Sequence, residues 1–414
     1  MAGAGADRRI AVVGGGMAAA RFVERYTALG GPGTVTVYAA EAHAPYNRVL
    51  LADVLIGRYA AEAIALPLGS ARLRTGCEAV AVDPAARKLV LADGTVEAWD
   101  ELVLATGAEP VLPAIPGLYR SGDGGDLTGG VHTLRSLDDC ARLAEQARTA
   151  RRAVVVGGGV LGVSTARALA ALGVRTAVVH RSAQLVSRQL DARAGEMLRE
   201  RLAALGVEVR CGSPAPALAT ESGRVIGVRP AGGPLLDCDL VVLACGTRPS
   251  TTLAKAAGLP VATGVLVDDR LAAGAPHVHA IGDCAEHRGT VHGLAAPAWD
   301  QADVLARRLS GAAPRARYTG SRPSSRLSTG GLEYAAFGAV DETLGEGLDV
   351  LRLTDATRGS YKKLVLRGDR LVGAILLGDL TGLDVLTDAW ERDDPLTGHP
   401  LHLLTAALPA ATAA

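Results

Sequence analysis

Short apolar runs rich in valine and isoleucine alternate with longer alanine- and leucine-rich stretches along most of the chain. The run at 10–13 precedes a helical pattern over 17–29 and a further run at 34–38, and the run at 153–156 opens a similar unit. Short β-branched runs favour strands, and strands that alternate with helical stretches favour parallel pairing. The pattern therefore predicts an α/β fold with parallel sheets.

The end of the chain has a different pattern. Apolar runs at 363–367 and 371–377 are joined by Gly-Asp, which indicates a β-hairpin, and a short helix is expected at 380–391. Proline- and glycine-rich residues around 110–117 are expected to form a crossing between domains. Further buried strands are expected within 101–107, 240–246 and 277–283.

Composition narrows the class of protein. The chain has 414 residues, of which 49% are hydrophobic, and Lys+Arg and Asp+Glu balance at 43 each. This balance, without a dominant basic stripe, argues against nucleic-acid binding through bulk charge. The N-terminal residues have no apolar core of signal-peptide length, and no apolar run approaches the roughly 18 residues of a membrane helix. We expect a soluble, cytoplasmic protein.

The six cysteines are widely spaced. No C-x-x-C occurs, so the usual zinc, iron–sulfur and thioredoxin-type spacings are missing. Cys238 and Cys245 bracket one expected strand, which places them roughly 23 Å apart and too far for one metal site. We interpret all six as reduced packing residues and expect no metal.

Two glycine-rich turns stand between a strand pattern and a helix pattern. In each, the first glycine allows the tight turn, the second lets the backbone approach a pyrophosphate, and the third small residue lets helix and strand pack closely. The helix N-terminus adds N–H donors and a partial positive charge. Two such turns indicate two dinucleotides, which is typical of a flavin reduced by a nicotinamide. The motifs are Gly14-x-Gly16-x-x-Ala19 and Gly157-x-Gly159-x-x-Gly162.

Further motifs give the chain a family resemblance. With Ala-Thr-Gly at 105–107 and Ile-Gly-Asp at 281–283 in this order, it resembles the two-dinucleotide flavoprotein reductases. Other stretches are similar to the flavin module of assimilatory NAD(P)H nitrite reductase large subunits and to the electron-transfer subunits of assimilatory nitrate reductases. These stretches are Pro45-Tyr-Asn-Arg-Val-Leu-Leu51, Ser187-Arg-Gln-Leu-Asp191, Gly293-Leu-Ala-Ala-Pro297 and Tyr361-Lys-Lys-Leu-Val-Leu366.

The resemblance implies two Rossmann-like dinucleotide-binding domains, with the nicotinamide domain inserted into a split FAD domain, and a small α+β C-terminal domain. The expected FAD domain comprises 1–125 and 247–318, the NAD(P)H domain 126–246, and the C-terminal domain 319–414. The full-length nitrite reductases continue into a cysteine-rich iron–sulfur segment and a sirohaem domain. Because this sequence ends at Ala414 without them, we expect a separate acceptor protein.

The same resemblance assigns residues to FAD. Glu41 would accept hydrogen bonds from the adenosine ribose and Asp283 from the ribityl chain; the alternatives are a solvated loop acid and a simple turn. Arg48 would pair with a phosphate or the flavin edge, or else be a surface arginine. A helix starting near Pro297 would direct its N–H groups and partial positive charge at the N1/O2 edge of the flavin. The remaining expected contacts are Gly14, Gly16, Met17, Ala18, Ala19, Thr106, Gly107, Gly282 and Ala298.

A second set would hold the nicotinamide nucleotide. His180 stands where NAD-specific sites usually place an acid, and Arg181 and Arg188 follow it. Without that carboxylate a 2′-phosphate meets no repulsion and an arginine can bind it, which favours NADPH slightly. Relatives with a similar histidine use NADH, so both nucleotides stay open. The other expected contacts are Gly157, Gly159, Leu161, Gly162 and, near the ring, Gly246.

A thiol relay is missing from the sequence. No cysteine falls within 21–29 or 43–51, where disulfide reductases, cysteine-dependent peroxidases and NADH oxidases carry theirs. Reduced flavin must then pass electrons directly to an outside acceptor, and no catalytic side chain is expected because hydride transfer needs no general acid or base. His277 and His279 would share one face of a strand, but with no third ligand nearby we expect no metal there.

The resulting expectation is an FAD-dependent NAD(P)H oxidoreductase that passes electrons to a separate iron–sulfur or sirohaem protein in nitrite or nitrate assimilation. Two alternatives remain: a reductase acting directly on a small organic molecule, and a non-catalytic redox sensor. The sequence leaves the oligomeric state open. A last group of basic residues consists of Arg315, Arg317, Arg322 and Arg326. This segment would either dock an acidic partner protein or form a solvated linker.

Overall fold

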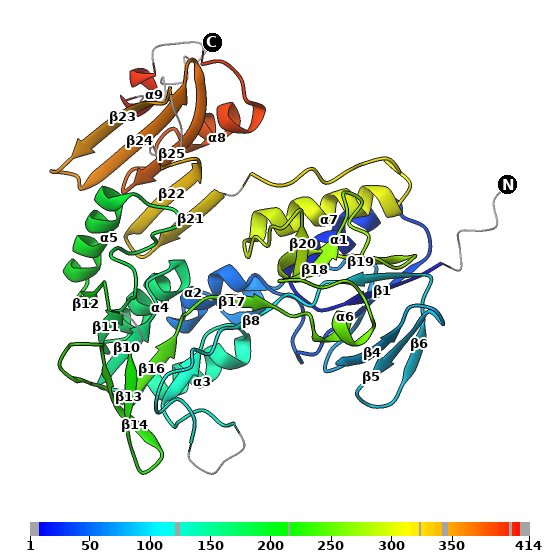
Figure 1. Cartoon of the computed structure of the whole chain (residues 1–414), viewed down its shortest axis with the longest axis horizontal. Coiled ribbons are helices and arrows are strands. Elements are labelled where there is room, and N and C mark those ends of the chain that lie inside the picture. Colours follow the sequence, from blue (N-terminus) through cyan, green and yellow to red (C-terminus); the bar gives the residue numbers. More distant parts are fainter. Residues whose placement is uncertain are drawn as a thin grey trace.

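The computed structural model describes residues 8–120, 125–213, 216–322, 324–341, 347–396 and 400–405. These residues form two α/β units on parallel five-stranded sheets and a third unit on an antiparallel five-stranded sheet (Figure 1). The start of the chain, the linker position 323 and the alanine-rich end after 405 lie outside the described residues.

The first unit is built from two segments of the chain, one before and one after the second unit in sequence. Its parallel sheet has the order β19-β7-β1-β2-β3, and β19 comes from after the second unit in sequence. The α1 and α7 helices lie side by side on it, and a small antiparallel sheet (β4-β5-β6) with α6 packs nearby. The elements are β1 (Arg9–Val13), α1 (Met17–Ala28), β2 (Thr34–Tyr38), α2 (Leu51–Leu55), β3 (Arg72–Arg74), β4 (Ala79–Asp83), β5 (Lys88–Leu91), β6 (Val96–Ala98), β7 (Glu101–Leu104), α6 (Thr252–Ala256), β18 (Val265–Val267), β19 (Val278–Ala280), β20 (Ala285–His287) and α7 (Ala295–Leu309).

The second unit repeats the strand–turn–helix arrangement with strand order β12-β11-β10-β16-β9. Its α3 helix starts with a capping box, in which the Ser136 hydroxyl accepts from the Asp139 amide and the Asp139 carboxylate accepts from the Ser136 amide. The elements are β9 (Val131–Thr133), α3 (Leu137–Ala147), β10 (Arg152–Val156), α4 (Val160–Ala171), β11 (Arg175–Val179), α5 (Ala192–Ala204), β12 (Val207–Arg210), β13 (Ala217–Glu221), β14 (Arg224–Arg229), β15 (Leu236–Asp237) and β16 (Leu240–Leu243).

Two antiparallel strands connect the units. β8 (Ala108–Pro110) leaves the first unit and β17 (Thr247–Pro249) returns to it, and the two pair with each other. This is the proline- and glycine-rich crossing that the sequence predicts. The second unit is therefore inserted between two halves of the first, and the predicted α/β class with an inserted domain is confirmed.

The third unit has the antiparallel order β21-β22-β25-β24-β23. The predicted hairpin is present, with Gly368 at φ +60° in the turn between β24 and β25. Figure 1 places this unit beside α5 of the second unit, away from the first. The elements are β21 (Ser324–Thr329), β22 (Leu332–Gly338), β23 (Asp349–Asp355), β24 (Ser360–Arg367), β25 (Arg370–Leu377), α8 (Leu383–Arg392) and α9 (Leu401–Thr405).

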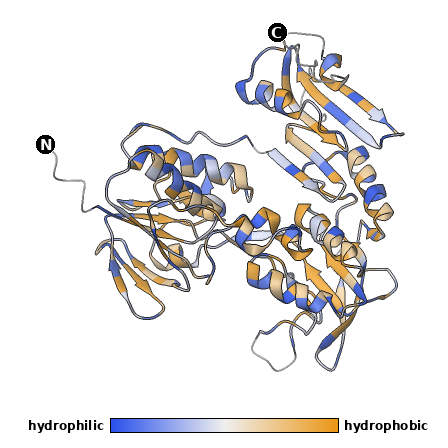
Figure 2. Cartoon of the chain, turned by 180° about the vertical axis from the view of Figure 1, so that it is seen from behind, coloured by the Kyte–Doolittle hydropathy of each residue, from blue (hydrophilic) through white to orange (hydrophobic). Residues whose placement is uncertain are grey.

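One apolar core joins all three units. It contains Leu51 of α2, Val178 of β11, and Leu332 and Ile375 of the C-terminal sheet, all buried. A separate core fills the first unit between its sheet, α1 and α7. Figure 2 shows the strands of both parallel sheets as mostly hydrophobic, as expected for strands covered on both faces. Among the described residues, no helix is both long and apolar enough to cross a membrane.

Candidate functional site

The two glycine turns have matching geometry. Gly14 has φ +112°, and a Cβ there would lie 2.2 Å from the carbonyl oxygen of Ala105. Gly157 has φ +121°, and a Cβ there would lie 2.1 Å from the carbonyl oxygen of Ala244. Both the left-handed backbone and the contact with the neighbouring strand require glycine at these two positions.

No side chain caps the N-terminus of the helix that follows each glycine turn. Gly16 and Gly159 are the N-cap residues of α1 and α4, neither supplies a side-chain cap, and a Cβ on either would meet nothing within 4 Å. A Cβ on Gly162, by contrast, would lie 1.9 Å from the Gly157 carbonyl oxygen, so this glycine serves packing. Both helices thus begin without a side-chain cap and with open space beside the N-cap glycine, as an approach of a pyrophosphate requires.

Three expected flavin contacts, Ala18, Gly282 and Ala298, come together at the start of α1. A Cβ on Gly282 would lie 2.8 Å from the Ala18 Cβ and 3.9 Å from the Ala298 Cβ. The Gly282 amide donates to the side-chain oxygen of Gln301 at 2.7 Å, which ties the Gly-Asp turn to α7. The α7 helix starts two residues before Pro297, and its N-cap, Leu294, makes no side-chain cap. Three uncapped helix N-termini (α1, α4 and α7) therefore belong to the predicted nucleotide sites.

Asp283 has a partner that the sequence did not reveal. Its Oδ2 atom lies 2.8 Å from Nη2 of Arg135, whose Nε donates to the carbonyl of Ala108 at 3.1 Å. Arg135 comes from the segment between β9 and α3, in the inserted unit. The carboxylate of Asp283 is thus oriented by a cation from the other nucleotide-binding domain.

Glu41 and Arg48 form an ion pair with each other. The hydroxyl of Tyr46 donates to Glu41 Oε2 at 2.6 Å, and Arg48 donates to the carbonyl of Arg135 at 2.8 Å. Burial raises the pKa of Tyr46, so its hydroxyl stays protonated. Ala39, two residues before Glu41, contacts the glycine turn, since its Cβ would lie 2.7 Å from a Cβ on position 15. The Glu41 carboxylate faces Tyr46 and Arg48 in this arrangement.

Thr106 and Gly107 fasten the crossing between the units. The Thr106 hydroxyl donates to the carbonyl of Ser250 at 2.7 Å, and the Ser250 amide donates to Gly107 at 2.9 Å. Gly246 has φ +101° and accepts from the Val111 amide across the same crossing. These residues fix the backbone where the two units meet, and the hydroxyl of Thr106 is bonded to the Ser250 carbonyl there.

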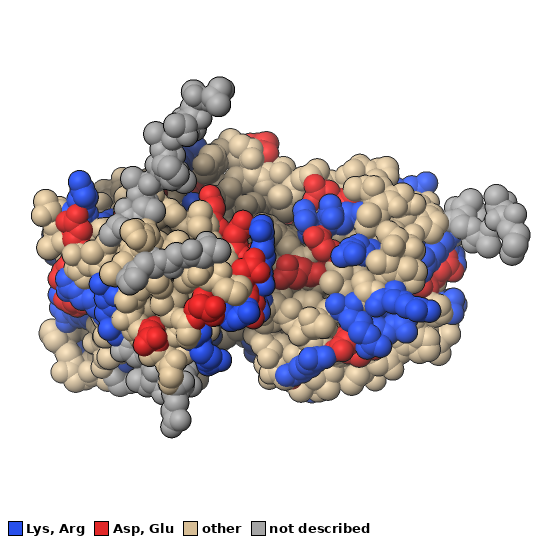
Figure 3. Space-filling model, turned by 90° about the horizontal axis from the view of Figure 1, so that it is seen from above, with Lys and Arg blue, Asp and Glu red and all other residues tan. Residues whose placement is uncertain are grey.

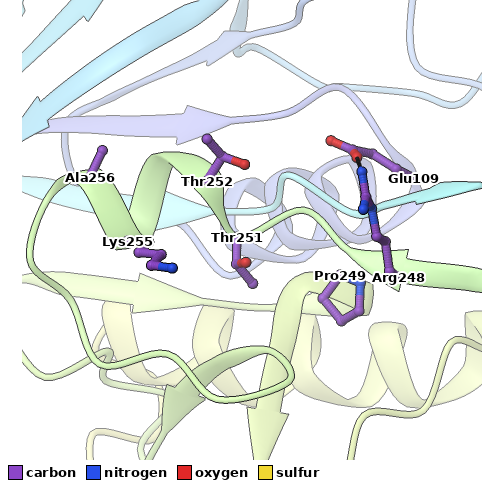
Figure 4. Close-up of a pocket in the computed structure, with 7 residues that line it drawn as sticks. All are labelled: Glu109, Arg248, Pro249, Thr251, Thr252, Lys255 and Ala256. Atoms are coloured by element: carbon purple, nitrogen blue, oxygen red, sulfur yellow. Dashed lines mark hydrogen bonds and ion pairs between the residues drawn. The ribbon is translucent and has the colours of Figure 1, made fainter. Parts of the chain in front are cut away.

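A polar pocket of about 560 Å³ lies beside this crossing. In Figure 4 the side chains of Arg248 and Glu109 point toward one another from β17 and β8, and Nη2 and Oε2 are 3.2 Å apart. Thr251, Thr252 and Lys255 at α6 form the opposite side of the pocket. It holds none of the predicted nucleotide contacts and is lined by short or charged side chains.

The inserted unit places His180 directly against its glycine turn. The His180 Nδ1 atom accepts from the Gly158 amide at 3.0 Å, and a Cβ on Gly158 would lie 2.7 Å from the ring. Burial, with the nearby Arg181 charge, lowers the pKa of His180. Because Nδ1 is an acceptor, the neutral ring carries its proton on Nε2. His180 is therefore a neutral donor where many sites hold an acid.

Arg181 and Arg188 are exposed on the loop that follows β11, and Leu161 on the first turn of α4 is 36% exposed. The Arg181 charge acts on both His180 and Cys245, the residue before Gly246, so it lies near the carboxyl ends of β11 and β16. Arg181 thus places a positive charge at this edge of the second sheet, where the sequence predicts a nucleotide.

His277 and His279 differ from the prediction. His277 lies just before β19 with φ +62°, so the two histidines do not follow one regular strand. Both bond to the buried carboxylate of Glu101, at 2.9 and 3.0 Å, and Arg8 approaches the same carboxylate at 2.6 Å. Glu101 is the nearby acidic group that the sequence did not reveal. Within the described residues, no three His, Cys, Asp or Glu side chains form a candidate metal group.

All six cysteines lie among the described residues and are free thiols. Cys284, next to Asp283, is fully buried, and its Sγ contacts the carbonyls of Leu104 and Ile281 at 3.5 and 3.3 Å. Burial raises the pKa of Cys284, as it does for Cys245 beside Gly246. Neither thiol has the environment of a reactive thiolate.

The basic residues of 315–326 are divided between two units. Arg317 lies 3.7 Å from Asp269 of the first unit, and Arg315 is exposed nearby. Arg322 contacts the carbonyl and ring of Trp390 in the C-terminal unit. Figure 3 shows basic side chains gathered over the face that carries α7 and the segment after it. Exposed arginines of α7, of the segment after it and of the neighbouring stretch 270–288 include Arg270, Arg288, Arg307, Arg315 and Arg317.

Two family models match the chain. Residues 8–302 match a pyridine nucleotide-disulphide oxidoreductase model, and residues 323–393 match the rubredoxin NAD+ reductase C-terminal domain. The first match includes both glycine turns, the Gly-Asp turn and the start of α7. The second match falls on the antiparallel sheet and α8.

Curated relatives and solved structures agree with these matches. The chain is 35% identical to a nitrite reductase [NAD(P)H] of Bacillus subtilis over 90% of this chain and 46% of that protein. It is 32% identical to an assimilatory nitrate reductase electron transfer subunit of the same organism, over 92% of this chain and 49% of that protein. The chain thus spans about half the length of these relatives. A ferredoxin reductase for the CYP199A2 system of Rhodopseudomonas palustris superposes with a TM-score of 0.81 and 27% identity, covering 97% of this chain and 100% of that one.

Proposed function

Because this chain belongs to the pyridine nucleotide-disulphide oxidoreductase family, we propose that it passes electrons from NAD(P)H through FAD to a separate redox protein, in nitrite or nitrate assimilation. The chain is an FAD-dependent NAD(P)H oxidoreductase. The acceptor, an iron–sulfur or sirohaem protein, is the proposed part. We also propose domain boundaries for this chain. Residues 1–125 and 247–318 would form the FAD domain, residues 126–246 the NAD(P)H domain and residues 319–414 the C-terminal domain.

The residues around the first glycine turn fit FAD. Gly16 leaves the α1 N-terminus open for a pyrophosphate, and Gly282 brings the backbone of the Gly-Asp turn close to Ala18. We assign Asp283 to the ribityl hydroxyls, with Arg135 orienting it, and Glu41 to the adenosine ribose. The N-terminus of α7 supplies N–H donors and a partial positive charge to the flavin edge. Bound FAD supplies hydride acceptance and one-electron release.

The second glycine turn fits the nicotinamide nucleotide. Gly159 leaves the α4 N-terminus open, and the neutral His180 ring offers an Nε2–H donor beside it. We assign the 2′-phosphate of NADPH to Arg181, supported by Arg188, and so keep a slight preference for NADPH over NADH. The glycine at position 246 leaves room where the domains meet, near the expected nicotinamide ring.

The observation that carries the proposed electron route is the state of the cysteines. A disulfide reductase needs a reactive thiol pair beside the flavin, but Cys284 is fully buried and the other five cysteines are also unpaired. Electrons must then leave the flavin for an external acceptor without a thiol intermediate. Six free thiols also support a reducing, cytoplasmic location.

The acceptor test compares classes of oxidant. The FAD-loaded protein is reduced by NADPH or NADH without oxygen and mixed with an iron–sulfur protein, ferricyanide, disulfides or small organic metabolites. We expect fast reoxidation by the one-electron acceptors and negligible reoxidation by disulfides. Faster reoxidation by one metabolite than by every redox protein would instead support a small-molecule reductase.

A further inference from the structure

Asp191 joins the inserted unit to the C-terminal unit. Its Oδ1 atom caps α5 by accepting from the Ala194 amide at 2.9 Å. Its Oδ2 atom accepts from the Tyr361 hydroxyl at 2.8 Å and lies 3.2 Å from the Lys363 ammonium. Tyr361 and Lys363 both lie on β24, and both are buried. One carboxylate thus ends a loop of the nucleotide domain and holds two side chains of the neighbouring domain.

The 184–191 loop, which ends at Asp191, packs against the second glycine turn. The Val186 amide donates to the Gly158 carbonyl at 2.8 Å, and Leu185 lies against the same glycine. Gln184 Nε2 donates to the Leu190 carbonyl at 2.7 Å, which closes the loop on itself. Val186 has φ +49°, a strained conformation for a β-branched residue that persists only where its surroundings fix it.

The connection is therefore continuous. The β24 side chains hold Asp191, Asp191 ends the 184–191 loop, and the loop meets Gly158 between the two glycines of the nucleotide turn. Gly158 is bonded at both backbone groups, since its amide donates to His180 and its carbonyl accepts from Val186. The same loop follows Arg181 and contains Arg188, the arginines assigned to the nucleotide.

Further hydrogen bonds hold the C-terminal side of this connection. Lys363 Nζ also donates to the Val340 carbonyl at 2.8 Å, so the ammonium is fixed from within its own domain. Burial, and then the hydrogen bond to Asp191, raises the pKa of Tyr361, which keeps its hydroxyl protonated as a donor. At the other end of α5, Arg201 donates to the carbonyl of Gly359 at 2.7 Å. The β24 side chains thus form a fixed support for the start of α5.

We propose that Tyr361 and Lys363 of the C-terminal domain are positioning residues for the nicotinamide-nucleotide site, acting through Asp191 and the 184–191 loop on Gly158. This inference rests on the proposed role of the second glycine turn. It gives the C-terminal domain a part in nucleotide binding, although none of its residues is assigned to the nucleotide itself. The hydrogen bond between Tyr361 and Asp191 joins the 361–366 and 187–191 stretches, which the sequence analysis singled out separately.

The test removes one hydroxyl in the full-length, FAD-loaded protein. In Tyr361→Phe, Asp191 loses one donor and the loop is less firmly held, so the Kd of the oxidised protein for NADP+ and NAD+, measured by calorimetry, should rise at least five-fold. The KM for NAD(P)H should rise in parallel, while kcat with ferricyanide stays within two-fold. Hydrogen exchange of peptides covering 180–191 should become faster without any nucleotide present.

The matched control is Tyr334→Phe. Tyr334 is equally buried in the same domain, but its hydroxyl bonds at 3.1 Å to Ser325 within that domain. It should leave both Kd values and the exchange of 180–191 unchanged. Asp191→Asn is the second variant: it keeps a helix cap and weakens the bond to Lys363, so it should act in the direction of Tyr361→Phe.

The outcomes separate the two proposals. Wild-type affinity and exchange in Tyr361→Phe and Asp191→Asn would overturn the positioning role, as would an equal effect of Tyr334→Phe. A wild-type protein that binds neither NADP+ nor NAD+ would overturn the proposed function of the second glycine turn itself. In that case the exchange experiment still reports whether β24 holds the 184–191 loop.

Discussion

At the scale of single residues, the neutral state of His180 shapes the nucleotide site. A protonated imidazole has no acceptor nitrogen, so it would lose the 3.0 Å hydrogen bond from the Gly158 amide. The lowered pKa of His180 agrees with this arrangement. A 2′-phosphate would then need its positive charge from an arginine, and the proposal assigns this role to Arg181, the next residue in the chain.

Arg181→Ala tests that assignment. We expect the KM for NADPH to rise by tens-fold while the KM for NADH changes little, because only NADPH carries the 2′-phosphate. Arg175→Ala, an exposed arginine at the other end of β11, is the control and should alter neither value. Equal effects of Arg181→Ala on both nucleotides would place the phosphate contact elsewhere.

Asp283→Ala tests the flavin site in the same way. A ribityl hydroxyl would lose a charged acceptor, which costs roughly 1.5–3 kcal/mol and weakens FAD retention about ten- to hundred-fold. Asp100→Ala removes an acid of the same domain that pairs with Arg9, and it should retain FAD normally. The measurement is flavin absorbance per chain after gel filtration. Full occupancy in Asp283→Ala would contradict the assignment.

At the scale of elements, local patterns were enough for the strand–turn–helix units. Both glycine turns, the Gly-Asp turn and the C-terminal hairpin follow from residues adjacent in sequence. The small antiparallel sheets β4-β5-β6 and β13-β14-β15 were not anticipated, because their short, half-exposed strands carry little apolar periodicity.

Partners that come from distant segments could not be predicted from the sequence. Arg135 reaches Asp283 across the domain crossing, and Glu101 meets His279 only because β7 and β19 pair in the sheet. Such contacts depend on tertiary packing, which a single sequence does not encode as a local pattern. The Asp191–Tyr361 bond belongs to the same class, although both stretches stood out in the sequence.

The pairing of β7 with β19 predicts a pH dependence of stability. Burial would raise the pKa of Glu101, but hydrogen bonds from His279, His277 and Arg8 outweigh it and lower the pKa to about 2. Because this is below the unfolded value, the carboxylate stabilises the fold above about pH 4.5 and loses that contribution as pH falls towards 2. The stability advantage of wild type over Glu101→Gln in urea unfolding should be roughly 1–1.5 kcal/mol smaller at about pH 3.5 than at about pH 6. A constant difference would contradict this role.

At the scale of the whole molecule, one apolar cluster joins α2 of the first unit to the second unit and the C-terminal sheet, and α7 extends from the proposed flavin site towards a basic face (Figure 3). An acidic redox protein would be steered to this face, so we expect its KM to rise with ionic strength. Arg315→Glu should raise that KM several-fold without changing turnover with a neutral quinone. Arg229→Glu, on β14 of the inserted unit, is the control and should have no effect. An unchanged KM in Arg315→Glu would place docking on another face.

The central claim is that electrons leave the flavin directly for a redox protein, and anaerobic stopped-flow reoxidation tests it most directly. Protein reduced by one equivalent of NADPH or NADH should show a single two-electron bleaching of the flavin. It should be reoxidised quickly by an iron–sulfur acceptor or ferricyanide and negligibly by disulfides, since Cys284 is buried and all six cysteines are unpaired. A small organic substrate that reoxidises the flavin orders of magnitude faster than every redox protein would contradict the claim.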